Sequence, residues 1–290
     1  MRILEYRAPD TLEEALEFLA QHGPEARISA GGTALTILLK EGLIHAARLV
    51  SLERLGLDYV TWQNGALHVG AMTSLQILAD HPVVSERVPI LAEVLKQVAS
   101  RRIRNVATLG GNVCWAEAAS DPPAVLVLLD AEVTIRSARG ERRVRMRDLF
   151  LDYFTTTLES DEIMTEIKVS PPSPGSGVSY IKFTPQSKAD KPVLGVAALA
   201  RPAENGACAE ARVVVGAAGP APLALPDADS EARGQAIDGG VLERLAERYA
   251  GAAQPVSDSR GSESYKRDMI RVLVPRALRQ AWARGGELHD

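Results

Sequence analysis

The sequence predicts an α+β protein whose sheets are mainly antiparallel. Two pairs of strand-like segments are each joined by a short turn, one across Asn64-Gly65 and one around 138–140, as in β-hairpins. A third observation is the segment 171–177, which is rich in proline and glycine and marks an expected domain boundary. Because hairpins pair consecutive strands, this pattern argues against the parallel sheet of a Rossmann domain.

Composition narrows the class of protein. The chain has 290 residues, 46% of them hydrophobic, which allows one large domain or two to three small ones. A net charge of −4 argues against a nucleic-acid-binding protein. No apolar run is long enough for a membrane span and Glu5 interrupts the opening residues, so we expect no signal peptide and a cytoplasmic protein. Two cysteines and five scattered histidines predict no metal site or iron–sulfur cluster in this chain.

The first region, 1–57, has the pattern of a small α/β unit. Apolar residues at helical spacing end before Gly23, and this predicts a helix whose N-cap is Asp10 or Thr11. A short helix is expected over 33–40, between strands over 26–30 and 48–51. A glycine turn at the end of the first strand therefore lies at the edge of this unit.

The second and third regions, 58–172 and 178–290, are predicted to hold antiparallel sheets and helices. In the second region, strands are expected over 59–63, 66–70, 132–136, 142–146 and 162–169, and helices over 73–79 and 90–98. The third region predicts a small α+β domain, with strands over 178–183, 193–200 and 211–217 and helices over 241–250 and 265–283. We expect 219–238 to be a surface loop or a partly mobile segment because it is rich in alanine, proline and aspartate.

The stretch 101–113 carries the strongest chemical signal. Its glycine pair, Gly110-Gly111, leaves backbone N–H groups open to an anion because no Cβ blocks the approach. Thr108 and Asn112 flank the pair with short side chains that can donate to phosphate oxygens. Asp121 follows, as an acceptor suited to a sugar or ribityl hydroxyl. Alone, this pattern predicts a polar cofactor with a phosphate.

A second glycine pair, Gly31-Gly32, lies with Thr33 between a strand-like run and a helix-like run. Such a turn at the start of a helix favours anions, although an isolated glycine pair is as often only a tight turn. Two such turns, each with a threonine, indicate two walls around one diphosphate. Neither turn is a Walker loop, and neither has the glycine spacing of the Rossmann fingerprint.

Three motifs taken together resemble a known family. Ala30-Gly31-Gly32-Thr33, the run 103–112 and Ser120-Asp121 are similar to the FAD-binding medium subunits of molybdenum hydroxylases. The resemblance extends over nearly the whole chain, from the opening 4–9 to the closing 264–267. It implies a two-subdomain FAD-binding domain of the vanillyl-alcohol-oxidase (PCMH) type, with subdomains 1–57 and 58–172. A C-terminal domain over 178–290, with a three-stranded antiparallel sheet and helices, is expected to follow.

The resemblance also assigns residues to the cofactor. Those implied to bind FAD through the two turns and the loop after them are Ser29, Ala30, Gly31, Gly32, Thr33, Ala34, Thr108, Gly110, Gly111, Asn112, Ser120 and Asp121. Lys182 matches a lysine near the flavin ring, where a cation would stabilise negative charge on the reduced ring, or it is an exposed strand lysine. Met164 matches an apolar position that packs against the ring, or it is ordinary core.

Three positions depart from the family pattern. Ala34 replaces an aspartate, Glu117 and Ala118 replace serine and proline, and 187–192 lacks an arginine. FAD binding is still expected despite these departures. They put in doubt which acceptor takes the electrons from the flavin. A local basic surface is expected from Arg101, Arg102 and Arg104 with the arginine-rich run 136–147. Such runs are usually solvated faces; if these arginines cluster, they could hold the adenine-nucleotide end or dock an acidic partner.

The resemblance implies an oxidoreductase subunit that transfers electrons. Partner chains would be a molybdopterin-binding large subunit and a small subunit with [2Fe–2S] clusters, and FAD would pass electrons to NAD, quinone, oxygen or another acceptor. No side-chain pattern here indicates a catalytic acid, base or nucleophile, in keeping with chemistry performed by the cofactor. Two alternatives stay open, a self-contained FAD-dependent oxidoreductase of the same fold and a nucleotide-binding or docking protein without redox activity.

Overall fold

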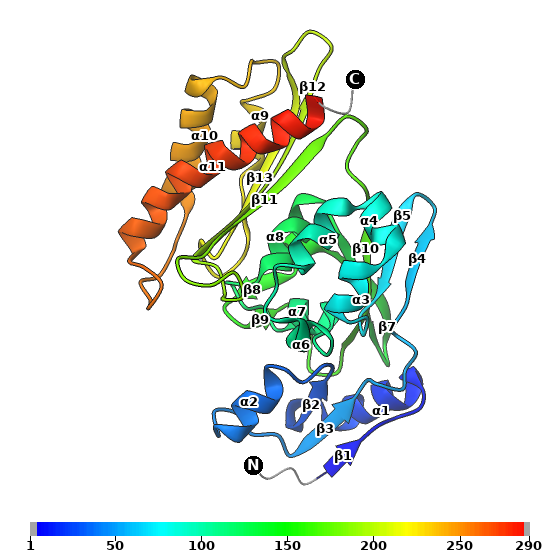
Figure 1. Ribbon diagram of the computed structural model, residues 1–290. Helices are drawn as coiled ribbons and strands as arrows, with labels where there is room; N and C mark the ends of the chain where they lie inside the picture. Colours follow the sequence, from blue (N-terminus) through cyan, green and yellow to red (C-terminus); the bar gives the residue numbers. More distant parts are fainter. Residues whose placement is uncertain (1–4, 287–290) are drawn as a thin grey trace.

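The computed structural model describes residues 5–286 and contains three successive sheet-based units (Figure 1). The first and third units lie at opposite ends of the molecule, with the second between them. The boundaries 1–57, 58–172 and 178–290 stay a proposal; each main sheet lies within one of these ranges, except that the third sheet begins one residue early, at Gly177. The expectation of no signal peptide concerns residues that lie mostly outside the described part of the chain.

The first unit is a parallel three-stranded sheet with the order β1-β3-β2. Its elements are β1 (Glu5–Arg7), α1 (Leu12–His22), a 3-10 turn (Gly23–Glu25), β2 (Ala26–Ser29), α2 (Leu35–Lys40) and β3 (Arg48–Ser51). Thr11 is the N-cap of α1, as one of the two alternatives predicted, since its side chain accepts from the amide of Glu14 at 3.2 Å. The turn 30–34 leaves β2 at its carboxyl end.

The second unit is an antiparallel five-stranded sheet with the order β4-β5-β10-β6-β7. The strands are β4 (Val60–Gln63), β5 (Ala66–Gly70), β6 (Glu132–Ser137), β7 (Gly140–Arg145) and β10 (Ile163–Val169), with a separate hairpin of β8 (Phe150–Asp152) and β9 (Thr155–Thr156). The helices are α3 (Leu75–Asp80), α4 (Pro82–Arg87), α5 (Pro89–Leu95), α6 (Arg101–Arg104), α7 (Leu109–Cys114) and α8 (Asp121–Leu128), with a 3-10 turn at Met146–Asp148. Strand β4 pairs antiparallel with β5, and β6 pairs antiparallel with β7, so both predicted hairpins are confirmed. Apolar residues of the helices and of the sheet share one core.

The third unit has a four-stranded antiparallel sheet, one strand more than predicted. Its elements are β11 (Gly177–Phe183), β12 (Leu194–Pro202), β13 (Cys208–Gly216), β14 (Leu223–Ala224), α9 (Pro226–Ser230), α10 (Gly239–Ala252) and α11 (Glu263–Gly286). Helices α10 and α11 cover one face of the sheet, and the other face is turned toward α5 and α8 (Figure 1). The sheet therefore packs on the second unit along α8 and against α5.

The prediction of a surface loop over 219–238 is wrong. This segment contains β14 and α9, and Ala228, Asp229 and Ala232 are buried in the core of the third unit. Asp229 accepts hydrogen bonds from the Tyr249 hydroxyl at 2.9 Å and the Val213 amide at 3.2 Å. Composition did not predict that this segment is ordered, because a buried network of hydrogen bonds around Asp229 fixes it in place.

Asp229 is expected to make the stability of the chain depend on pH. Burial raises the pKa of its carboxyl from an ordinary 3.8 to about 7. Between these values the folded chain holds a proton that the unfolded chain has released, so stability falls as the pH rises from about 4 to about 7. Asp229→Asn keeps the shape without titrating and should remove a dependence of a few kcal/mol, since one pKa unit corresponds to about 1.4 kcal/mol. Urea unfolding between pH 5 and 8 measures this, and an unchanged slope in the variant would contradict it.

Two absences hold for the described residues. No helix within 5–286 combines the length and apolarity needed to cross a bilayer. In the same part of the chain, no group of three or more histidine, cysteine, aspartate or glutamate side chains has the arrangement of a metal site.

Candidate functional site

The structure brings the two glycine turns together. A Cβ added to Gly31 would lie 2.1 Å from the carbonyl oxygen of Val106, at the entry to the second turn. A Cβ added to Gly111 would lie 3.3 Å from the Cβ of Ala30. The turns are thus in van der Waals contact across the boundary between the first and second units, although 80 residues separate them in sequence. The absence of a side chain at Gly31 is what permits this approach.

The first turn presents a run of backbone donors. Within residues 5–286, the amides from Gly31 to Ala34 have no hydrogen-bond acceptor in the protein. Gly32 has a φ of +66°, and this left-handed conformation lets successive N–H groups converge on one side, as in anion-binding nests. Residues 29–34 are only partly exposed. Half-buried amides without partners are uncommon, because such groups normally find an acceptor.

The second turn uses part of its donor capacity inside the protein. Thr108 caps α7, its hydroxyl oxygen accepting from the amide of Gly111 at 3.0 Å. The amide of Gly110 donates to the carbonyl of Ala71 at 2.9 Å, and a Cβ on Gly110 would lie 2.7 Å from that oxygen. The amides of Gly110 and Gly111 are thus both bonded within the protein, so the predicted donation of either one to a phosphate would require it to give up an existing hydrogen bond. Gly110 permits close packing of α7 on the β5–α3 turn instead.

Asn112 and Ser120 continue the site beyond the second turn. The Ser120 hydroxyl donates to Oδ1 of Asn112 at 2.8 Å, which orients the side-chain amide of Asn112. Its NH₂ group has no acceptor within the described chain and stays available to a ligand. Ser120 directly precedes Asp121, the first residue of α8. The hydrogen bond thus connects the glycine turn to the N-terminal end of this helix.

Asp121 and Lys182 form a buried ion pair between the second and third units. The ammonium Nζ of Lys182 lies 2.9 Å from Oδ2 of Asp121 and donates to the carbonyl of Gln97 at 2.7 Å. The two side chains are only 3% and 5% exposed, so the alternative of an exposed strand lysine is wrong. Burial raises the pKa of the Asp121 carboxyl, while Lys182 acts in the opposite direction.

Tyr180 completes this cluster and was missed from the sequence. Its hydroxyl donates to Oδ1 of Asp121 at 2.7 Å. A signal for it existed, because Tyr180 and Lys182 are two residues apart on a predicted strand and so point to the same face. Burial and the charge of Asp121 raise the pKa of Tyr180 well above its ordinary value, so the hydroxyl remains a donor.

Met164 lies in the core of the second unit. It is almost fully buried on β10, and its sulfur lies 3.9 Å from the sulfur of Cys114, the last residue of α7. Burial raises the pKa of Cys114 to about 12, which keeps it a thiol. Without a ligand Met164 is thus core, as one alternative stated, and its contact with a flavin ring stays a prediction.

The arginine-rich run does not form a free basic surface. Each arginine of β7 and its flanks faces a carboxylate, and the pairs are Arg136–Glu13, Arg139–Asp161, Arg142–Glu162, Arg143–Glu132, Arg145–Asp148 and Arg147–Asp130. Arg104 is bonded to Gln76 and to backbone carbonyls. The prediction of a basic patch over 136–147 is therefore wrong, because a carboxylate lies beside each of these arginines and neutralises the surface.

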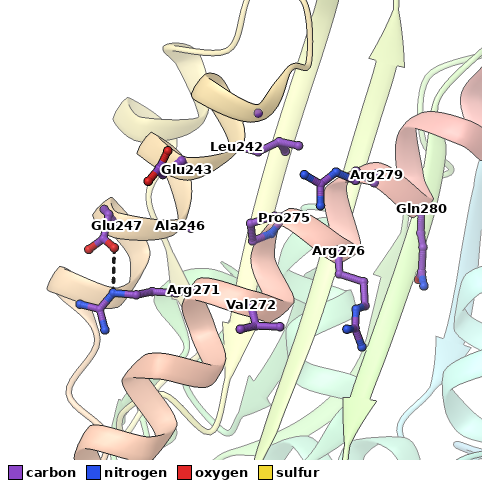
Figure 2. A pocket seen from close by; sticks show the side chains of 11 residues that line it. Leu242, Glu243, Ala246, Glu247, Arg271, Val272, Pro275, Arg276, Arg279 and Gln280 are labelled. Carbon is purple, nitrogen blue, oxygen red and sulfur yellow. Dashed lines mark hydrogen bonds and ion pairs between the residues drawn. The ribbon is translucent and has the colours of Figure 1, made fainter.

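A groove of about 610 Å³ lies elsewhere, between α10 and α11 (Figure 2). Leu242, Val272 and Pro275 contribute apolar surface to it, and Glu247 pairs with Arg271 at 2.8 Å along it. None of the residues predicted for the cofactor lines this groove. It is therefore a separate feature of the third unit.

The residues around the two turns fit a dinucleotide with a diphosphate. Partnerless amides of the first turn and the NH₂ group of Asn112 can donate to phosphate oxygens, while Asp121 supplies acceptor oxygens farther along. Lys182 adds a cation, of whose three N–H donors two are used within the described chain. The donors of the first turn and Asn112, the Asp121 acceptor and the Lys182 cation thus lie in succession from the first unit to the third. An extended cofactor with phosphate groups at one end requires such an arrangement.

Comparison with known proteins identifies the family of this chain. Residues 2–172 match the family described as FAD binding domain in molybdopterin dehydrogenase, and residues 179–281 match the CO dehydrogenase flavoprotein C-terminal domain. The chain is 30% identical to the 6-hydroxypseudooxynicotine dehydrogenase complex subunit alpha of Paenarthrobacter nicotinovorans, over 96% of this chain and 94% of the relative. It is also 30% identical to the carbon monoxide dehydrogenase medium chain of Hydrogenophaga pseudoflava, over 97% of each.

A solved structure shows the same fold. Carbon monoxide dehydrogenase from Hydrogenophaga pseudoflava, in a form that lacks the Mo-pyranopterin moiety, superposes with a TM-score of 0.94 at 30% identity and covers 98% of both chains. Fold and site thus define an FAD-binding flavoprotein of the PCMH type. The chain belongs to the FAD-binding medium subunits of molybdenum hydroxylases. The expected fold class, cofactor and oxidoreductase class are confirmed by these matches.

Proposed function

We propose that the FAD diphosphate binds between the two glycine turns. The amides of Gly31 to Ala34 would donate to one side of it, and the Gly111 end of α7 with the Asn112 side chain would form the other side. The partnerless amides of the first turn are the observation that carries this assignment. The two turns would be formed with the help of Ser29, Ala30, Thr33 and Thr108. Ala34 would contribute its backbone amide, since it has no acidic side chain.

The ribityl and ring end of the cofactor would lie toward the third unit. Asp121 would accept from a hydroxyl group, and the remaining N–H of Lys182 would face the flavin, with Met164 beneath the ring. Bound FAD supplies electron transfer, and the protein holds it, excludes water from Lys182 and sets the local charge. The Lys182 cation is largely balanced by Asp121, so its effect on the flavin would be smaller than that of a lone lysine.

The chain would act in the cytoplasm as the electron-transferring subunit of a heteromeric molybdenum hydroxylase. Electrons would arrive from a partner subunit with [2Fe–2S] clusters, after a molybdopterin-binding large subunit has oxidised the substrate. They would leave to NAD, quinone, oxygen or another acceptor. Relatives described as a medium chain and as a subunit of a dehydrogenase complex support this assignment.

Purification tests this function directly. We expect full-length protein to be yellow, to release FAD rather than FMN on heating, and to co-purify from its native host with chains that carry molybdenum and iron. Colourless protein that takes up no added FAD would contradict the flavin assignment and favour a nucleotide-binding or docking protein. Turnover of a substrate by this chain alone would favour the self-contained oxidoreductase.

A further inference from the structure

Each oxygen of the Asp121 carboxylate is held by a different residue of one strand. Tyr180 donates to Oδ1 at 2.7 Å, and Lys182 lies 2.9 Å from Oδ2. Both donors project from the same face of β11, onto the first turn of α8. Because the Asp121 carboxylate and the Lys182 side chain are buried and Tyr180 is partly buried, rotation of the carboxylate would leave at least one of these groups without a partner, at the cost of an unpaired polar group.

The third unit makes room for the tyrosine hydroxyl at one position. A Cβ added to Gly195 on β12 would lie 2.3 Å from the hydroxyl oxygen of Tyr180. Gly195 is paired across the sheet with Gly216, where an added Cβ would lie 3.5 Å from Ala124 of α8. Gly195 therefore leaves the space that the Tyr180 hydroxyl occupies beside Asp121, whereas a side chain at Gly216 would only be in ordinary van der Waals contact with α8.

Asp121 is connected to the second glycine turn, Gly110-Gly111, through its neighbour Ser120. Its neighbour Ser120 donates to Asn112, whose NH₂ group is free for the cofactor. The orientation of the Asp121 carboxylate is thus set from the third unit by Tyr180 and Lys182, and its backbone position is set from the second unit by Ser120. The ion pair with Asp121 explains why Lys182 is buried. Electron transfer itself requires no contact from Tyr180, so its hydrogen bond to Asp121 needs a separate explanation.

We propose that Tyr180 is a positioning residue for the cofactor, which acts by holding the Asp121 carboxylate in the orientation that accepts an FAD hydroxyl. This inference rests on the proposed FAD site. Without the tyrosine hydroxyl, Oδ1 of Asp121 has no donor and the carboxylate is less firmly oriented. The carboxylate must then become ordered when FAD binds, and this lowers the affinity. Affinity for FAD should fall about tenfold, the effect of losing one hydrogen bond to a charged group.

A matched pair of variants separates positioning from stability. Tyr180→Phe and Tyr249→Phe each remove a buried hydroxyl that donates to a buried aspartate, the second at 2.9 Å to Asp229 inside the third unit. In full-length apoprotein titrated with FAD, we expect the dissociation constant to rise about tenfold in Tyr180→Phe and to stay within twofold of wild type in Tyr249→Phe. Thermal unfolding of both apoproteins measures the structural effect separately.

A double-mutant cycle tests whether Tyr180 acts through Asp121. In the Asp121→Ala background, Tyr180→Phe should change the FAD dissociation constant less than twofold, because the acceptor that it positions is gone. The same tenfold loss in that background, or equal effects of the two tyrosine variants, would overturn the inference. Wild-type protein that binds no FAD would instead overturn the proposed function on which the inference rests.

Discussion

Gly31→Ala is expected to weaken FAD binding by about 100-fold or more. The new Cβ would lie 2.1 Å from the Val106 carbonyl oxygen and 2.8 Å from its carbon, so one of the two turns must move. Both neighbours are backbone atoms that cannot rotate away, and a displacement of about 1 Å at a binding site can cost 100-fold. Flavin absorbance per chain after purification, followed by titration of apoprotein with FAD, measures the loss.

Gly42→Ala is the matched control for this variant. Gly42 lies in the same unit, has a φ of +70° and has open space around an added Cβ, so alanine strains the backbone without touching the second turn. We expect this control to lower stability by about 1 kcal/mol and to bind FAD normally. A folded Gly31→Ala protein with wild-type affinity for FAD would show that the diphosphate does not lie between the two turns.

Lys182→Met is expected to lower the free energy of unfolding by about 3–5 kcal/mol near pH 8, because it leaves a buried carboxylate without its cation. Burial already raises the pKa of Asp121, and removal of Lys182 raises it further. The folded variant then binds a proton that the unfolded chain, with a pKa of about 3.9, has released. The deficit relative to wild type should therefore shrink as the pH falls toward 5, and urea unfolding at pH 5.5 and 8 measures it.

The double variant Asp121→Asn with Lys182→Met removes both charges. It should regain most of the lost stability at pH 8, since the cost of a broken pair comes from the remaining buried charge. A deficit that is independent of pH in the single variant, or no recovery in the double variant, would show that Lys182 stabilises the chain by packing of its alkyl stem instead.

Much of the fold was readable from local patterns. The turns at Asn64-Gly65 and 138–140 predicted their hairpins, and helical spacing of apolar residues predicted α1, α10 and α11. The segment 219–238 was misread because its order comes from Asp229 and Tyr249, which contact each other across 20 residues. Composition carries no information on such a contact, and a polar segment with a buried anchor looks like a loop.

The sequence by itself determined the class of this protein. The glycine pairs, their flanking threonines and Ser120-Asp121 are local motifs, and backbone access at a glycine is a property of the residue and its neighbours. Only the tertiary structure decided how these motifs are used. It placed Gly31 against Val106, bonded the Gly110 amide to Ala71 and joined Asp121 to Tyr180 and Lys182. Hydrogen bonds and close contacts between distant segments depend on how three units pack, and no local pattern encodes that packing.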